Sequence, residues 1–300
     1  MVAFNRYGLW RGHTWAYELF KRHHEELNAL YWSYSTVVRD AKRQGEKVDE
    51  KQVISKAFSL SRSNQWAEFR KVSLWKDKFS DFDNWTRLNA ALALFSYFEV
   101  YLHTVVCLAL ESDPGVQLGA TRAIDGVKIL KSERLHNSLE VAEECVKGDW
   151  TKRVNKYKSL FGQVPSQLVD EISELDQLRN LRNGVGHTFG RELTAYKSRI
   201  ALHPAKMSRL SEDRLKKWLG LIHEIALSID KHLGFEHIGE YETIYYYHQW
   251  LPTNREPWQR EGKAKSLRID GAFSIELNRF LINGPGADFC KDLIIYYDSI

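Results

Sequence analysis

The sequence predicts a mainly α-helical protein, and three observations support this fold class. In the 300-residue chain no proline occurs before Pro114, and the same stretch holds only three glycines. Apolar residues recur along it at spacings of three and four, which is the period of an amphipathic helix. Hydrophobic residues make up 43% of the chain and charged residues 27%, a balance typical of a chain that folds around a core.

The N-terminal region is predicted to form basic helices. We expect helices over Trp15–Lys42 and Asp49–Ser61, separated at Gly45, and a short third helix over Asn64–Trp75. Residues 1–80 hold 15 Lys and Arg against nine Asp and Glu. Such an excess is compatible with nucleic acid, although a solvated helical surface is the simpler interpretation. The side chains that would guide RNA are Arg39, Lys42, Arg43, Arg70 and Lys71.

A central helix is expected from about Ser80 or Asp81 to Ser112, where Asp113-Pro114-Gly115 ends it. It is apolar on all faces, which predicts a buried position. A membrane span over Ala90–Leu110 is disfavoured, because Glu99 and His103 would be expensive in lipid. In a core helix the Glu99 carboxylate should be paired or protonated.

The location predicted by the sequence is cytoplasmic, with no membrane attachment. Residues 1–12 lack the apolar stretch of a secretory signal. The three cysteines are far apart and form no CxxC pair, as expected for reduced, buried thiols. His103 and Cys107 lie four residues apart, but no second pair of ligands has suitable spacing, so we predict core packing and no metal or cofactor.

Further helices are expected towards the C-terminus, over Ser132–Lys147, Trp150–Phe161, Pro165–Arg182 and Ser211–Leu233. Beyond Gly234, Tyr245–Tyr247 and Leu293–Tyr297 are strand-like by composition, although short apolar runs are ambiguous. A second basic cluster lies near Trp250 and Trp258, where bases could stack. Its members are Arg255, Arg260, Lys263, Lys265 and Arg268.

The motif whose side chains are best suited to catalysis is Arg182-Asn183-Gly184-Val185-Gly186-His187. Arginine suits a phosphate, histidine suits proton transfer near neutral pH, and asparagine can orient either. On an unbroken helix, residues five apart point about 140° away from each other. We therefore expect Gly184 and Gly186 to end the helix and turn the chain, so that Arg182 and His187 converge.

Arg182 should emerge on the core-facing side of its helix, because it follows Leu178 by four residues and Leu175 by seven. A lone cation there would be costly, as would the carboxylate of Glu99. An ion pair between Arg182 and Glu99 would satisfy both groups and fix the guanidinium. Arg179 is the rival partner for Glu99.

The motif resembles the Arg–polar–x–x–x–His signature of HEPN proteins, which are mostly all-α nucleic-acid-processing domains. Phe98-Glu99 and Tyr101-Leu102 resemble part of the family's early helix, and Gln177–Asn183 resembles the helix that leads into its motif. The resemblance covers roughly residues 80–235. It implies a HEPN-like four-helix bundle at 80–235, an N-terminal helical extension at 1–79 and an aromatic-rich extension at 236–300.

The resemblance also implies a metal-independent endoribonuclease whose site is shared between two copies of the chain. By position, Arg182 would bind the scissile phosphate, His187 would act as general acid or base, and Asn183 would orient one of them. Glu99 would orient Arg182. The expected partners are RNA, a second copy of the chain and an antitoxin or regulatory protein. The expected role is that of a toxin, a phage-defence effector or a stress effector. The alternative is a non-catalytic HEPN-like module for dimerisation or nucleic-acid binding.

Overall fold

A computed structural model of the chain describes residues 4–59, 71–133, 138–188, 206–254, 266–281 and 284–300. Within these ranges the protein is mainly helical and contains no strand; the β-type contact is an isolated bridge between Val53 and Lys71. The all-α prediction is confirmed.

The chain folds into two compact units, each assembled from separate stretches of sequence. Unit 1 comprises Met1–Leu19, Glu99–Ile172 and Ile225–Ile300, and unit 2 comprises Phe20–Phe98 and Ser173–Glu224. The boundaries at 79/80 and 235/236 expected from the sequence stay a prediction. Three long helices contribute residues to both units: α1 (Trp15–Glu46), α3 (Val72–Ser112) and α9 (Glu212–Leu233).

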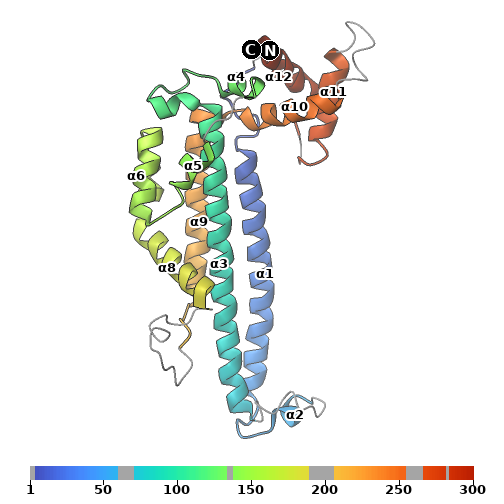
Figure 1. Ribbon diagram of the computed structural model, residues 1–300. Coiled ribbons are helices and arrows are strands. Elements are labelled where there is room, and N and C mark those ends of the chain that lie inside the picture. Colours follow the sequence, from blue (N-terminus) through green and yellow to red (C-terminus); the bar gives the residue numbers. More distant parts are fainter. Residues whose placement is uncertain (1–3, 60–70, 134–137, 189–205, 255–265, 282–283) are drawn as a thin grey trace. The chain divides into compact units, whose positions relative to one another are not determined.

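Unit 2 gathers parts of α1, α3, α9 and α8 (Ile172–Thr188), together with the short helix α2 (Ile54–Ala57). Helices α1 and α3 run side by side (Figure 1), joined by an ion pair of 2.5 Å between Lys42 and Asp83. Helices α8 and α9 are joined where Trp218 Nε1 donates to Glu174 at 2.9 Å. Four helical segments thus pack together within this unit.

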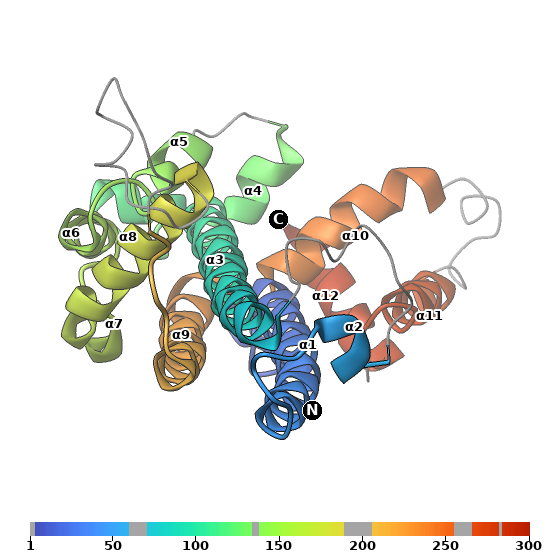
Figure 2. The ribbon, with the colours of Figure 1, turned by 90° about the horizontal axis from the view of Figure 1, so that it is seen from below.

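Unit 1 consists mainly of shorter helices. Among them α10, α11 and α12 group together in both views (Figure 1 and Figure 2), α11 packs against α12, and α10 packs against α4. The bounds are α4 (Gly126–Lys131), α5 (Ser138–Glu143), α6 (Trp150–Phe161), α7 (Ser166–Asp170), α10 (Tyr241–Asn254), α11 (Ser266–Leu277) and α12 (Ala287–Ser299).

The two expected strands are wrong, because Tyr245–Tyr247 lies within α10 and Leu293–Tyr297 lies within α12. The reason is the spacing of the buried side chains. In α10 the buried apolar side chains are Tyr241, Ile244 and Tyr247, which fall on one face of a helix. Helical periodicity has outweighed the β-propensity of tyrosine and isoleucine.

Several helix boundaries also differ from expectation. Helix α3 begins at Val72 and not near Ser80, because Val72 is fully buried and extends the packed face towards the N-terminus. The expected helix over Asp49–Ser61 is reduced to α2. Most of Asn64–Trp75 lies outside the described residues. The expected helix over Pro165–Arg182 is divided into α7 and α8 at Glu171.

Helix α3 contains a segment that is long and apolar enough to cross a membrane, judged by length and composition alone. Half of that segment is buried inside the protein. Its buried side chains include Leu94, Phe98 and Val105, as expected for a core helix. Core helices of soluble proteins meet the same criterion, so the cytoplasmic location stays a prediction.

Candidate functional site

The motif lies in the last turns of α8, and the helix continues through it. Helix α8 ends at Thr188, beyond both Gly184 and Gly186, and neither glycine adopts a positive φ. The expected break in the helix is therefore wrong. Glycine can adopt the helical conformation, although each glycine lowers the stability of the helix by roughly 1 kcal/mol relative to alanine. On a regular helix, positions five residues apart, such as 182 and 187, lie about 140° apart around the helix axis.

Arg182 is held in a defined direction by two contacts within unit 2. Its Cζ atom lies 5.4 Å from the centroid of the Phe95 ring on α3. Its Nη1 donates a hydrogen bond to Asn183 Oδ1 at 3.0 Å. The side chain is partly exposed. A planar cation that lies over a ring and is hydrogen-bonded at one edge has little rotational freedom, so the partly exposed guanidinium is held in a defined orientation.

The rest of the motif provides an anchor and an open strip of backbone. Val185 is buried at 6% exposure and fixes the helix against the unit. A Cβ atom placed on Gly184 or Gly186 would meet nothing within 4 Å among the described residues. The backbone of His187 is helical, and its side chain lies outside the described part of the chain. The helix therefore presents bare backbone beside Arg182.

Glu99 forms an ion pair that was not expected from the sequence. Its Oε1 lies 2.9 Å from Nη1 of Arg153 on α6, and the Arg153 residue is only 5% exposed. The Arg153 guanidinium also lies 4.7 Å from the centroid of the Trp150 ring. The signal was available: Trp150, Arg153 and Tyr157 share one face of α6, which places Arg153 towards the core.

Arg179, the rival partner for Glu99, has a partner on its own helix. Its Nε lies 2.9 Å from Oδ1 of Asp176, three residues earlier on α8. The rival pairing of Arg179 with Glu99 stays a prediction. The pairing of Glu99 with Arg182 stays a prediction.

The N-terminal basic side chains are exposed but engaged in ion pairs. Arg39 contacts Glu212 at 2.7 Å, and Arg43 contacts Asp40 at 2.5 Å. Surface pairs of this kind are weak, so they leave the arginines able to exchange partners. Lys71 is exposed. The other predicted RNA contacts, Arg70, Arg255, Arg260, Lys263 and Lys265, lie outside the described residues, as does the side chain of Arg268.

The cysteines behave as core residues. Cys107 Sγ lies 3.9 Å from both ring nitrogens of His103, and burial raises the pKa of the Cys107 thiol to about 12. A thiol in this state is neither a good nucleophile nor a ready metal ligand. Across the described ranges no group of three or more His, Cys, Asp or Glu is placed to hold a metal ion.

Comparison of the chain with protein-family models, with curated proteins and with solved structures finds no match. The features of the chain that bear on function are therefore the motif and its surroundings. These provide an oriented, partly exposed cation, an amide beside it and bare helix backbone. Such an arrangement can bind a phosphate and stabilise negative charge that develops on it.

Proposed function

We propose that the chain is a metal-independent endoribonuclease of the HEPN-like type, with Arg182, Asn183 and His187 as its catalytic group. The observation that carries the proposal is the placement of Arg182. Its guanidinium is fixed by Phe95 and Asn183, yet it remains partly exposed at the end of α8. A cation oriented before the substrate binds stabilises transition-state charge without reorganisation.

In the proposed reaction the ribose 2′-hydroxyl attacks the adjacent phosphorus. His187 accepts the hydroxyl proton or donates a proton to the departing 5′-oxygen, and Arg182 neutralises charge on the phosphate oxygens. The P–O5′ bond breaks, leaving a 2′,3′-cyclic phosphate and a 5′-hydroxyl. Because DNA has no 2′-hydroxyl, the substrate is RNA. Asn183 acts as a positioning residue through its hydrogen bond to Arg182.

Two copies of the chain form the proposed site. On a continuous helix, Arg182 and His187 of one copy point about 140° apart and do not share one phosphate. A second copy that meets the end of α8 supplies its His187 to the Arg182 of the first copy. Gly184 and Gly186 favour this approach, because a Cβ atom added at either position would meet nothing within 4 Å among the residues that the structure describes. By the same resemblance, the biological role is that of a toxin or defence effector controlled by a partner.

The direct test is RNA cleavage by purified protein in EDTA, with DNA of the same sequence as the negative substrate. We expect products with cyclic phosphate ends, and a loss of roughly 100-fold or more in rate for Arg182→Ala and His187→Ala. The matched control is Arg209→Ala, which removes an exposed arginine of unit 2 that pairs with Asp81 at 2.7 Å. Undiminished cleavage by both motif variants would contradict the assignment.

A mixing experiment tests the shared site. A dimer of one Arg182→Ala chain and one His187→Ala chain keeps a single intact Arg182–His187 pair, on opposite copies. We expect the mixture to recover cleavage that neither variant shows alone. Absence of recovery would favour a site within one copy. Dimerisation and RNA binding without cleavage by the wild type would favour the non-catalytic module.

A further inference from the structure

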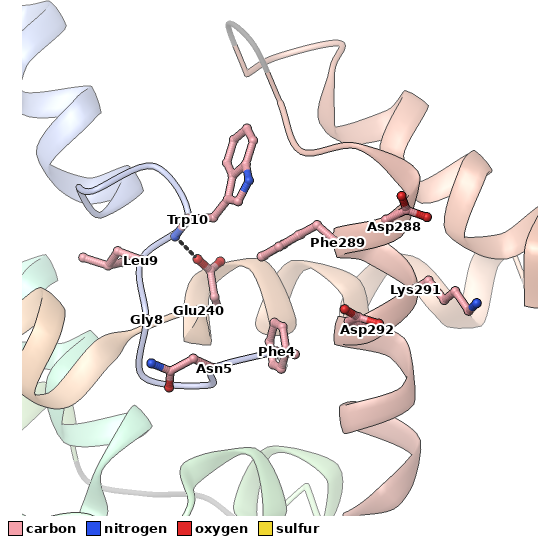
Figure 3. A pocket seen from close by; sticks show the side chains of 10 residues that line it. All are labelled: Phe4, Asn5, Gly8, Leu9, Trp10, Glu240, Asp288, Phe289, Lys291 and Asp292. Atoms are coloured by element: carbon pink, nitrogen blue, oxygen red, sulfur yellow. Dashed lines mark hydrogen bonds between the residues drawn. The ribbon is translucent and has the colours of Figure 1, made fainter. Parts of the chain in front are cut away.

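Unit 1 contains a cavity of about 440 Å³ (Figure 3). It is formed by the N-terminal segment around Phe4 and Trp10, the residue Glu240 just before α10, and the first turns of α12. Its volume lies within the range of sites that hold small molecules. All of its walls belong to one unit, and none contains a residue of the ribonuclease motif.

Aromatic rings form the middle of this cavity. The ring centroids of Phe4 and Phe289 are 5.7 Å apart, and those of Trp10 and Phe289 are 5.9 Å apart. Trp10 is 46% exposed, which is unusual for so large an apolar side chain. Ring faces attract cations, and they also cover methylene groups.

A carboxylate lies on each side of the rings, and a third lining carboxylate, Asp288, is exposed at the start of α12. Figure 3 shows Glu240 on one side and Asp292 on the other, with Phe4 and Phe289 between them. Glu240 is 6% exposed, and its two oxygens accept hydrogen bonds from Trp10 N at 2.5 Å and Thr243 Oγ1 at 2.9 Å. A carboxylate has about four acceptor positions, so Glu240 retains capacity for a ligand.

Asp292 is the more available of the two carboxylates. It is partly buried and extends from α12 towards the cavity, and no hydrogen bond or ion pair links it to another residue that the structure describes. The neighbouring cation, Lys291, is exposed and extends away from Asp292 and the rings (Figure 3). The cavity therefore has a carboxyl group at each end and no cationic side chain between them.

We propose that this cavity binds an alkyl diamine or polyamine, with one ammonium group at Glu240 and another at Asp292. Its methylene chain lies against Phe4 and Phe289. A monoamine would leave one carboxylate without a partner, and an anion would be repelled by both. The whole chain carries a formal net charge of +4, so a dication is not drawn to its surface in general and needs a local site.

The test is calorimetric titration of nucleic-acid-free protein with α,ω-diamines of increasing chain length and with spermidine. We expect saturable binding with one site per chain and a maximum at one chain length, because the two carboxylates are fixed. The monoamine of that length should bind about tenfold weaker or worse, since it lacks one charge-assisted hydrogen bond. No saturable binding, or equal affinity for monoamine and diamine, would overturn the proposal.

Variants locate the binding to the cavity. Asp292→Asn should weaken diamine binding about tenfold, and Trp10→Ala should weaken it several-fold by removing a ring face. Both side chains are at least partly exposed, so the fold is expected to persist, as circular dichroism can check. The matched control is Asp298→Asn, an exposed aspartate on the same helix outside the cavity, which should bind as the wild type does. Equal affinities of Asp292→Asn and the wild type would overturn the site.

Discussion

The two units differ in how many polar side chains they bury. Most of the buried polar and charged residues that the structure describes belong to unit 1, including Arg153, Asp230 and His237. They are matched closely: His237 Nδ1 lies 2.9 Å from Asp113, and Thr14 Oγ1 donates to Asp230 at 2.6 Å. Unit 2 buries few such groups and keeps its motif partly exposed. Most of the buried charges of unit 1 are therefore committed to the fold, whereas the motif at the end of α8 lies at a partly exposed position.

Two arginines make the comparison concrete. Arg153 and Arg182 each lie against an aromatic ring, at 4.7 Å from Trp150 and 5.4 Å from Phe95 respectively. Arg153 is 5% exposed and faces a carboxylate, whereas Arg182 is partly exposed and its hydrogen bond is to an amide. The first arrangement neutralises the cation. The second orients the cation at a partly exposed position.

The largest predicted effect follows from breaking the Arg153 pair. Arg153→Ala leaves the Glu99 carboxylate without this partner, and we expect the free energy of unfolding to fall by about 3–5 kcal/mol. Urea denaturation measures this loss. Arg182→Ala should change stability by only about 1 kcal/mol, because its side chain is partly exposed. Equal losses for the two variants would contradict the division between structural and accessible arginines.

Much of the fold was predictable, because helical periodicity extends over most of the described chain. Helix α6 has the predicted bounds of Trp150–Phe161, and α9 begins one residue after the expected Ser211. The predictions of secondary structure were wrong where the local propensity of the residues competed with the packing of the helix. Tyr245–Tyr247 has strand-like composition, but its neighbours bury one helical face.

The site was predictable in part. The sequence indicated that Glu99 needs a partner, but it pointed to arginines near the motif and not to Arg153. It also took Gly184 as a signal for a helix end, whereas α8 tolerates it. Glycine permits a turn without requiring one. Which partner a buried charge finds depends on tertiary packing that spacing along one helix does not contain.

The pH dependence of stability gives a second, smaller contrast. Burial raises the pKa of Glu242 in unit 1 to about 8, from an ordinary value of 4.5, and also raises the pKa of Asp230. Between pH 4.5 and about 8 the folded chain keeps a proton on Glu242 that the unfolded chain releases. Glu242 therefore lowers the free energy of unfolding as pH rises. Glu242→Gln does not ionise. Its free energy of unfolding should therefore increase relative to wild type from pH 4.5 to 8, by at most about 1.4 kcal/mol per pH unit.

Urea denaturation of Glu242→Gln and of the wild type at several pH values measures the difference in their free energies of unfolding. Other titrating groups, such as His24 and His232, are the same in both proteins and cancel in this difference. Glu174 of unit 2 is the opposite case, because hydrogen bonds from Lys217 and Trp218 lower the pKa of its carboxyl. The ionised Glu174 carboxylate stabilises the fold above about pH 4.5, and this stabilisation is lost as pH falls. Glu174→Gln should therefore be less stable than wild type above about pH 4.5, and the difference should disappear only in acid. A constant difference between Glu242→Gln and wild type would contradict the burial argument.

The smallest effect distinguishes a structural role of the motif glycines from a functional one. Gly184 and Gly186 are helical and have open space beside them, so Gly184→Ala and Gly186→Ala should each stabilise the fold by about 0.5–1 kcal/mol. The matched control is Gly220→Ala on α9, an exposed helical glycine of the same unit with similar space. In the proposed ribonuclease the added methyl groups at 184 and 186 obstruct the phosphate or the second copy, so RNA cleavage should fall although stability rises. If all three variants gained stability and cleaved RNA equally well, close approach at these glycines would not be part of the mechanism.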